Sequence, residues 1–278
     1  MTQTVQNSLT TKPRLGLIGI PLDENSTYMR GSALAPQRIR EALYCESTNT
    51  WCEAGINIGA GEVFVDAGDV DFTGEADSFE KIESAIDDLL VRGLLPLSLG
   101  GDHAITYPII KAIKKKYPVL HILHFDAHPD LYDELYGNRR SHACPFARIM
   151  ENEYAQRLVQ VGIRTMNGHQ RAQAERFGVE VMEMKNWYDD ITLKFDAPLY
   201  ISLDLDVLDP AFAPGISHYE PGGMSTRQVV RILQNVKAPQ LVGADIVELN
   251  PLRDPTGLTA MVAAKLFKEI AARMITQK

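Results

Sequence analysis

The sequence predicts an α/β protein: a single-domain, three-layer α/β/α arrangement around a mostly parallel sheet of roughly eight strands. Three observations support this. Short apolar segments alternate with longer helical patterns from one end of the 278-residue chain to the other. The apolar segments run without polar alternation, which is typical of strands that helices cover on both faces. Hydrophobic residues make up 45% of the chain, which is enough for a large core.

Eight segments have the character of strands. Each is short, rich in leucine, isoleucine and valine, and bounded by turn-forming or polar residues. In chain order they are 14–20, 63–66, 94–100, 119–126, 158–163, 179–184, 198–204 and 240–249.

Six longer stretches with helical periodicity follow or separate these segments. Local signals set several of their ends. Pro36 suits a first helical turn, Ser225 or Thr226 suits an N-cap, and Gly93 and Gly178 suit helix ends. The predicted helices are 36–44, 78–93, 104–117, 169–178, 225–236 and 256–277.

No internal repeat, low-complexity block or linker-like stretch divides the chain. We therefore expect one domain over residues 14–278. Residues 1–13 lack the basic and apolar regions of a signal peptide, so we expect them to form a disordered tail.

Charge and cysteine content exclude several classes of protein. A formal net charge of −8 offers no basic stripe for nucleic acid or an anionic membrane. No apolar run approaches the ~18 residues that a membrane-spanning helix needs. Cys45, Cys52 and Cys144 are an odd number of cysteines, which suits a reducing compartment better than a disulfide framework. These features predict a cytoplasmic protein without nucleic-acid or membrane partners.

Polar side chains of ligand type follow three predicted strands, just where each apolar run stops. In an extended segment, residues two apart face the same side, so such pairs can aim at one point. Because ligands bind outside the carboxyl ends of parallel strands, we expect these side chains to meet at one site. The set comprises His103 after 94–100, Asp126, His128 and Asp130 after 119–126, and Asp204 and Asp206 at the end of 198–204.

The composition of this set favours a pair of divalent metal ions. Buried carboxylates are costly unless something pairs with them or neutralises them. The four carboxylates carry a charge of −4, which two dications would neutralise. Carboxylate-rich ligation without thiolates suits manganese better than a structural zinc site. We therefore predict two Mn²⁺ ions ~3.5–4 Å apart, with some carboxylates bridging them.

Other polar residues near these motifs have ordinary structural explanations. Asp102 suits a helix N-cap, and Asp209, which precedes a proline, suits a turn. His124 lies within its strand and is expected in the core. His169 and His218 are expected to be exposed.

The ligand-type residues lie in three motifs, "GGDHA", "DAHPD" and "SLDLDVLDPAFAPGISHYEPGG". Together these motifs resemble those of the ureohydrolases, the arginase and agmatinase family of binuclear manganese amidinohydrolases. The resemblance runs from "GIPLDENSTYMRGSALAPQRIREAL" to "GADIVELNP" and covers nearly the whole chain. It implies an arginase-like fold and a homotrimer or homohexamer, an assembly that would also explain the apolar helix 256–277.

The resemblance implies a division of the six ligands between two metals. Asp126 and Asp204 would bridge the pair. The first ion would be held by His103, Asp126, Asp130 and Asp204, and the second by His128, Asp126, Asp204 and Asp206.

Three residues are candidates for catalysis. Glu248 matches the family glutamate that pairs with the substrate guanidinium, and His142, in "RRSHACPF", matches the loop histidine that relays protons. Asp130 would pass the proton of the attacking water to the departing amine. The chain departs from the family pattern at Ala104, where a serine is frequent, and at Ala143, where a glycine is common.

The implied reaction is the hydrolysis of a small guanidino compound to urea and an amine. Agmatine, giving putrescine, is the first expectation. Asp133 and Glu134 in the segment 131–142 would receive its ammonium tail, and the acidic residues Asp23 and Glu24 of the loop 21–31 favour a cationic tail. Arg139 and Arg140 would instead receive a carboxylate, which leaves guanidinobutyrase, guanidinopropionase, arginase and formimidoylglutamase as alternatives. The alternative interpretation is that these four charges form a solvated loop or pair with one another.

Two other classes of protein remain open. A same-fold amide deacetylase typically keeps one zinc with fewer acidic ligands, and a non-catalytic oligomeric subunit would lose ligands. The complete set of six argues against both. The loop 21–31 is expected to form a further wall of the site.

Overall fold

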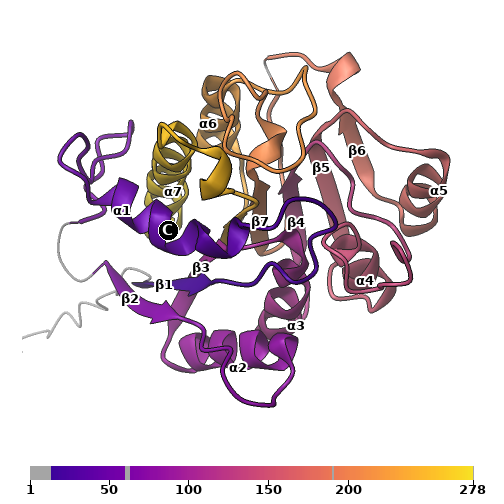
Figure 1. Cartoon of the computed structure of the whole chain (residues 1–278), viewed down its shortest axis with the longest axis horizontal. Helices are drawn as coiled ribbons and strands as arrows, with labels where there is room; N and C mark the ends of the chain where they lie inside the picture. The colour runs from indigo at the N-terminus through magenta and orange to yellow at the C-terminus, as the bar shows by residue number, and fades with distance from the viewer. Residues whose placement is uncertain (1–13, 60–62, 190, 278) are drawn as a thin grey trace, which may run out of the picture.

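The computed structural model describes residues 14–59, 63–189 and 191–277, and over these residues eight parallel strands form one sheet (Figure 1). Each strand overlaps one of the eight predicted segments, and the predicted fold class is confirmed. The strands are β1 (Arg14–Ile20), β2 (Phe64–Asp69), β3 (Leu94–Gly100), β4 (His121–Phe125), β5 (Arg157–Ile163), β6 (Glu180–Glu183), β7 (Leu199–Asp204) and β8 (Leu241–Val247).

The order of the strands puts the predicted ligand-bearing segments at the centre of the sheet. The order is β2-β1-β3-β8-β7-β4-β5-β6. Every residue of β3, β4, β7 and β8 is buried, which is why these strands have continuous apolar sequences. Their carboxyl ends therefore lie side by side in the middle of one sheet edge.

Helices cover both faces of the sheet. Ala35–Leu43, Thr226–Asn235 and Leu258–Thr276 form α1, α6 and α7 on one face, where they share a hydrophobic core with the strands. Figure 1 shows the remaining helices on the other face, where their buried residues form a second core with the sheet. Those helices are α2 (Ser78–Val91), α3 (Thr106–Lys116), α4 (Pro145–Glu151) and α5 (Gly168–Phe177).

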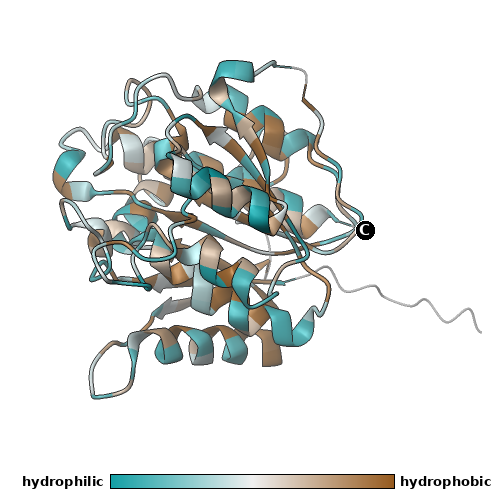
Figure 2. Cartoon of the chain, turned by 90° about the vertical axis from the view of Figure 1, so that its right-hand side faces the viewer, coloured by the Kyte–Doolittle hydropathy of each residue, from teal (hydrophilic) through white to brown (hydrophobic). Residues whose placement is uncertain are grey.

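The helices carry hydrophilic and hydrophobic residues side by side, as expected of helices that rest one face on a sheet (Figure 2). Local capping agrees with the sequence. Ser225 caps α6 and Gly178 ends α5 in the left-handed conformation, both as predicted. Asp77 caps α2 by accepting hydrogen bonds from Phe79 and Glu80.

The C-terminal helix α7 packs within its own subunit. Leu266, Phe267 and Ile270 are buried in the core that α7 shares with α1 and α6. Its apolar sequence is thus explained by burial against the sheet. It gives no support to the expected trimer or hexamer, which continues to rest on the family resemblance.

One helix was not predicted. The seven-residue α4 follows the segment 131–142 and buries Phe146 and Ile149 against the second core. Fewer than two helical turns give too little periodicity to be recognised from sequence. Of the helices in the described part of the chain, none is long and apolar enough to cross a membrane. The expected disordered tail, residues 1–13, lies outside the described residues.

Candidate metal centre

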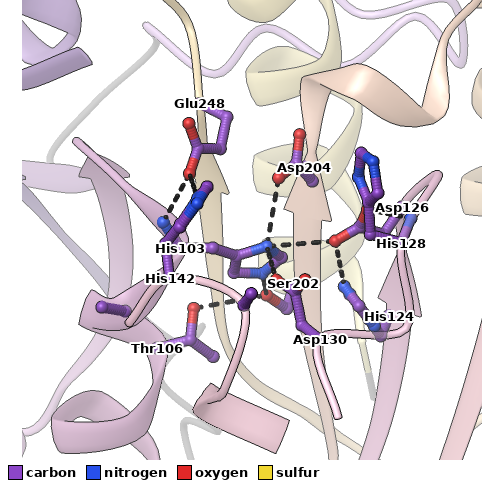
Figure 3. A network of polar contacts seen from close by, with 12 residues as sticks. His103, Thr106, His124, Asp126, His128, Asp130, His142, Ser202, Asp204 and Glu248 are labelled. Atoms are coloured by element: carbon purple, nitrogen blue, oxygen red, sulfur yellow. Dashed lines mark hydrogen bonds and ion pairs between the residues drawn. The ribbon is translucent and has the colours of Figure 1, made fainter. Parts of the chain in front are cut away.

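The carboxyl ends of β3, β8, β7 and β4 meet at one polar cluster (Figure 3). Close backbone packing brings these ends together. Gly101 follows β3, and a Cβ at this position would lie 1.9 Å from the carbonyl oxygen of Leu22, so only glycine fits there. Gly162 on β5 has φ +97° and passes close to the carbonyl of Asp126.

His103 lies among three carboxylates. Its Nδ1 is 3.1 Å from Asp204 Oδ2, 3.2 Å from Asp126 Oδ2 and 3.3 Å from Asp130 Oδ2. Its Nε2 is 2.9 Å from the hydroxyl of Ser202. This contact turns Nδ1 toward the carboxylates.

His128 forms the other half of the cluster. Its Nδ1 lies 2.9 Å from Asp206 Oδ2 and 3.3 Å from Asp126 Oδ1. Asp126 therefore presents one oxygen to each histidine, as a carboxylate that bridges two cations would. The six predicted ligands are all brought together, and their roles as ligands are a proposal developed below.

Buried negative charge dominates this cluster. Burial and then the neighbouring Asp126 raise the pKa of Asp130 to about 6. Burial, Asp206 and Asp126 raise the pKa of Asp204 well above its usual value. Burial also opposes ionisation of Asp126, but His124, His103 and His128 outweigh it and hold its pKa low. The site needs positive charge, which among the described residues comes from histidines that contact the carboxylates.

The donor set fits the predicted metal pair. It consists of imidazole nitrogens and carboxylate oxygens without sulfur, which suits Mn²⁺. Asp126 is 0%, Asp204 and Asp206 are 3%, and Asp130 is 6% exposed, so dications would replace lost solvation. Asp130 also has a positive φ of 49°, a strained conformation of the kind that clusters at functional sites.

A layer of buried residues orients the ligands from below. His124 Nε2 lies 2.8 Å from Asp126 Oδ2, and the amide of Gln160 donates to His124 Nδ1 at 3.0 Å. His124 is thus buried, as predicted, but it also holds a proposed ligand. Asp245 on β8 accepts the hydroxyl proton of Ser202 at 2.7 Å, which extends the chain of contacts behind His103.

Glu248 follows β8 and links the cluster to the predicted catalytic loop. Its Oε1 accepts a hydrogen bond from the backbone N–H of His103 at 2.9 Å and lies 3.0 Å from His142 Nδ1. Glu248 has φ 66°, which again marks strain. Although burial opposes it, the Glu248 carboxylate raises the pKa of His142 to about 9.

A cavity of about 140 Å³ opens beside the cluster. It is lined by four residues of the cluster and by the two catalytic candidates beside it: Asp130, Asp204, Asp206, His128, His142 and Glu248. Its remaining wall is neutral or weakly basic and consists of Thr27, Tyr132, Leu135, Ala143, Gln170 and His218. Thr27 comes from the loop 21–31, which was expected to form a wall.

The charged residues predicted to bind the substrate tail lie elsewhere. The described residues that line the cavity do not include Asp133, Glu134, Arg139 or Arg140. Arg139 forms ion pairs with Asp133 and Glu151, both at 3.0 Å. Ion pairing within the loop and with α4 engages Asp133 and Arg139, and Arg140 is paired with an aspartate that precedes α2.

Sequence reasoning missed His218, which was expected to be exposed. Its ring lies 4.9 Å from that of His142 and lines the cavity. The usable signal was its position in the "ISHYEPGG" end of the third motif. His169 is exposed as expected, and Asp102 caps a short helix by accepting a hydrogen bond from Ala104.

Comparison with known proteins finds similarity to the arginase family. A sequence profile of the "Arginase family" matches residues 13–272. Mitochondrial arginase 1 of Arabidopsis thaliana is 48% identical over 281 residues, covering 95% of this chain and 82% of that protein. Agmatinase of Bacillus subtilis is 32% identical over 262 residues, covering 91% of this chain and 89% of that protein.

A solved structure resembles the whole fold. The arginase from Medicago truncatula superimposes with a TM-score of 0.89 at 44% sequence identity, covering 95% of this chain and 88% of that chain.

These relatives contradict the predicted cytoplasmic location. Several of the plant proteins are named as mitochondrial or chloroplastic. The cysteine argument failed because it reports the redox state of a compartment, and a reducing interior does not by itself identify the cytosol.

Proposed function

The chain belongs to the arginase family of hydrolases that act on guanidino C–N bonds, and we propose that its substrate is L-arginine, hydrolysed to urea and L-ornithine. One observation carries this choice over the other guanidino compounds. Apart from the residues of the cluster, His142 and Glu248, the described residues that line the cavity are neutral except for one histidine, and they include no carboxylate or guanidinium.

A cavity wall without carboxylate or guanidinium groups suits a substrate tail that has no net charge. Agmatine ends in a lone ammonium and needs a carboxylate partner, whereas a guanidino acid ends in a lone carboxylate and needs a cation. The α-amino acid end of arginine is zwitterionic and has no net charge. Hydrogen-bonding groups such as Thr27, Tyr132 and Gln170 suit such an end.

The proposed ligands of two manganese ions are His103, His128 and the four aspartates of the cluster. The metal pair would lower the pKa of a water molecule so that it attacks near neutral pH, a help that the delocalised guanidinium carbon requires. Asp126 and Asp204, in contact with His103, are the proposed bridging ligands.

The chain's own residues orient the substrate and move its protons. Glu248 would bind the guanidinium by charge-assisted hydrogen bonds, in place of its contact with His142. Asp130, whose Oδ2 lies 3.3 Å from His103, would accept the proton of the attacking water and give it to the departing amine. His142 would exchange protons between the cavity and solvent.

Agmatine, the first expectation from the sequence, becomes the competing substrate. Its support came from Asp133 and Glu134 and from the acidic residues of the loop 21–31, and none of these carboxylates lines the cavity. The relatives favour the same order, since an arginase at 48% identity is more similar than an agmatinase at 32%.

Urea release by the manganese-loaded protein tests the proposal. The panel contains L-arginine, agmatine, 4-guanidinobutyrate and 3-guanidinopropionate, with formamide followed for formiminoglutamate. We expect kcat/KM for arginine to exceed that of every other compound by at least about 100-fold. Preference for agmatine or a guanidino acid would refute arginine as the substrate.

A variant of the wall adds a second check. The Tyr132 hydroxyl accepts a hydrogen bond from Asn167 and keeps its own proton for the substrate. Tyr132→Phe should lower kcat/KM for arginine by about 5- to 10-fold, the loss of one hydrogen bond of ~1 kcal/mol. An equal loss with agmatine would mean that Tyr132 does not contact the amino acid end.

We also propose that the chain assembles as a homotrimer or homohexamer, as the family resemblance implies. Light scattering on the purified protein gives its mass. A monomer or dimer at micromolar concentration would refute the assembly without touching the assignment of substrate.

A further inference from the structure

A second cluster of metal-ligand type adjoins the six-residue site. Among the described residues, His142, His218 and Glu248 each have one ligand atom within 4.8 Å of the others. None of the three belongs to the proposed ligands of the manganese pair. We propose that this cluster binds one zinc-class divalent cation, and that the bound ion excludes the guanidino substrate.

The geometry supplies three converging donors. His142 Nδ1 lies 3.0 Å from Glu248 Oε1, close enough for both atoms to reach one ion. The rings of His142 and His218 lie 4.9 Å apart with an angle of 39° between their planes. Within the described part of the chain, no group hydrogen-bonds to the ring of His218, so its nitrogens remain available to a ligand.

Two of the donors are already held in place. His142 Nε2 lies 2.9 Å from the hydroxyl of Thr27, which leaves Nδ1 to face the cluster. Glu248 Oε1 accepts the backbone N–H of His103 at 2.9 Å. Metal-binding histidines usually have their second nitrogen engaged in this way, which fixes the ring and raises its affinity for the ion.

The donor types separate this cluster from the manganese site. Two imidazoles with one carboxylate are a common zinc set with an open fourth position, which the cavity provides here. The six-residue site has four carboxylates and favours harder cations. Zinc, and to a similar degree nickel or copper, should therefore choose the second cluster while manganese keeps the first.

Charge explains why such an ion would compete with substrate. Glu248 is 4% exposed, and a carboxylate buried this deeply needs a cation beside it. The substrate guanidinium and a dication are two cations that would occupy the same carboxylate. They cannot occupy it together, so the ion should act as a competitive inhibitor. This consequence, unlike the binding itself, rests on the proposed function.

Metal analysis of the holoprotein tests the binding without any substrate. Protein loaded with manganese is titrated with Zn²⁺ by calorimetry, and bound manganese and zinc are counted after removal of free ions. We expect one zinc per chain in addition to two retained manganese ions. Loss of one manganese for each zinc gained would mean exchange at the first site and would overturn the proposal.

Paired variants locate the ion. His218→Phe keeps an aromatic ring against Tyr28 and His142 but removes both ring nitrogens. It should weaken the additional zinc by at least about tenfold, while His169→Phe, at an exposed histidine, should not. Unchanged zinc affinity in His218→Phe would overturn the assignment. Retained manganese content in both variants shows that they fold.

Kinetics test the consequence separately. Zinc should raise the apparent KM of the unsubstituted enzyme without lowering kcat, and His218→Phe should resist this effect relative to its own uninhibited rate. A fall in kcat at constant KM would refute the exclusion of substrate. An enzyme inactive on every guanidino compound, yet binding the additional zinc, would refute the proposed function and leave the binding site standing.

Discussion

Asp126 faces both histidines of the metal cluster, with one carboxylate oxygen toward His103 and the other toward His128. It is fully buried, and His124 donates a further hydrogen bond to it. A single side chain thus connects the two halves of the cluster. At the residue scale, the site depends on carboxylates that are stable only beside cations.

Asp126→Ala or Asp204→Ala should remove metal binding and activity together. Either change deletes a proposed bridging ligand, so we expect loss of both manganese ions and a fall in kcat/KM of at least about 10³-fold. Metal content by elemental analysis and urea release check this. Asp196→Ala, at a side chain that is 94% exposed, is the control and should behave as the unsubstituted protein. Normal turnover in Asp126→Ala would remove that residue from the site.

Glu248→Gln should separate substrate binding from metal binding. The substitution keeps size but loses the charge that would pair with the guanidinium, which is worth about 2–3 kcal/mol or roughly 30- to 150-fold in kcat/KM. Manganese content should stay at two per chain. A variant that loses its metals would show that Glu248 supports the cluster and does not act mainly on substrate.

The loop between β4 and α4 acts as a unit held by ion pairs. Asp133 pairs with Arg139 at 3.0 Å and with Arg148 at 2.7 Å, and Arg148 also pairs with Glu151 of α4. At the element scale, these contacts fix the loop that carries His142. They also explain why its charged side chains are not turned to the cavity.

A double substitution of Arg139 and Arg140 by alanine should therefore leave substrate choice unchanged. We expect the ratio of kcat/KM for arginine, agmatine and 4-guanidinobutyrate to stay within about twofold. Stability should fall slightly, since partly exposed ion pairs contribute ~0–1 kcal/mol each. Selective loss of activity on carboxylate-bearing substrates would place these arginines at the substrate after all.

Glu53 joins its loop to α6 and α7 and makes stability depend on pH. Its hydrogen bond with Arg227, reinforced by Lys265 and opposed by burial, lowers its pKa from 4.5 to about 2. Because the folded-state pKa is the lower one, the stabilisation is complete above pH 4.5 and is lost as pH falls toward 2.

Glu53→Gln should thus destabilise the protein at pH 7 by less than about 1 kcal/mol, since the side chain is 35% exposed and screened by solvent. Urea unfolding at pH 7 and at pH values below 4.5 should reveal a difference between the two proteins that shrinks on acidification. A difference independent of pH would assign the effect to packing and not to charge.

At the scale of the whole molecule, the polar site lies at the carboxyl ends of the central strands, between the two hydrophobic cores that cover the faces of the sheet. The central strands are buried on both faces, and the residues of the cluster lie at their carboxyl ends and in the loops that follow. Repulsion among four buried carboxylates opposes folding of the metal-free protein. Metal binding should therefore stabilise the entire domain and not only the site.

Removal of metal by EDTA should lower the melting temperature. At a metal concentration about 100 times Kd, binding adds ~2.7 kcal/mol, which corresponds to roughly 5–10 °C for a chain of this size. Thermal unfolding with EDTA and with added Mn²⁺ measures the difference. Asp204→Ala should melt at one temperature under both conditions, and a large shift in that variant would indicate metal binding elsewhere.

All eight strands and most of the candidate site were predictable from the sequence. Strands buried on both faces have continuous apolar sequences, and the proposed ligands follow them at alternate positions. Both signals can therefore be recognised from a short stretch of sequence. The helix α4 was not predicted, because seven residues make fewer than two helical turns and show too little periodicity. Residues with a local explanation, such as Ser225 at its helix cap, were correctly interpreted.

The sequence by itself determined the α/β architecture, the edge of the sheet that carries the site and the six side chains proposed to hold metal. Only the tertiary structure decided which loop residues face the cavity. Thr27 meets His142 across 115 residues, and Arg140 meets Asp77 across 63. Such contacts leave no trace in local spacing, because the direction of a loop side chain is set by partners far away in the chain. For that reason His218 lines the cavity, while Asp133, Arg139 and Arg140 of the loop 131–142 form ion pairs away from it.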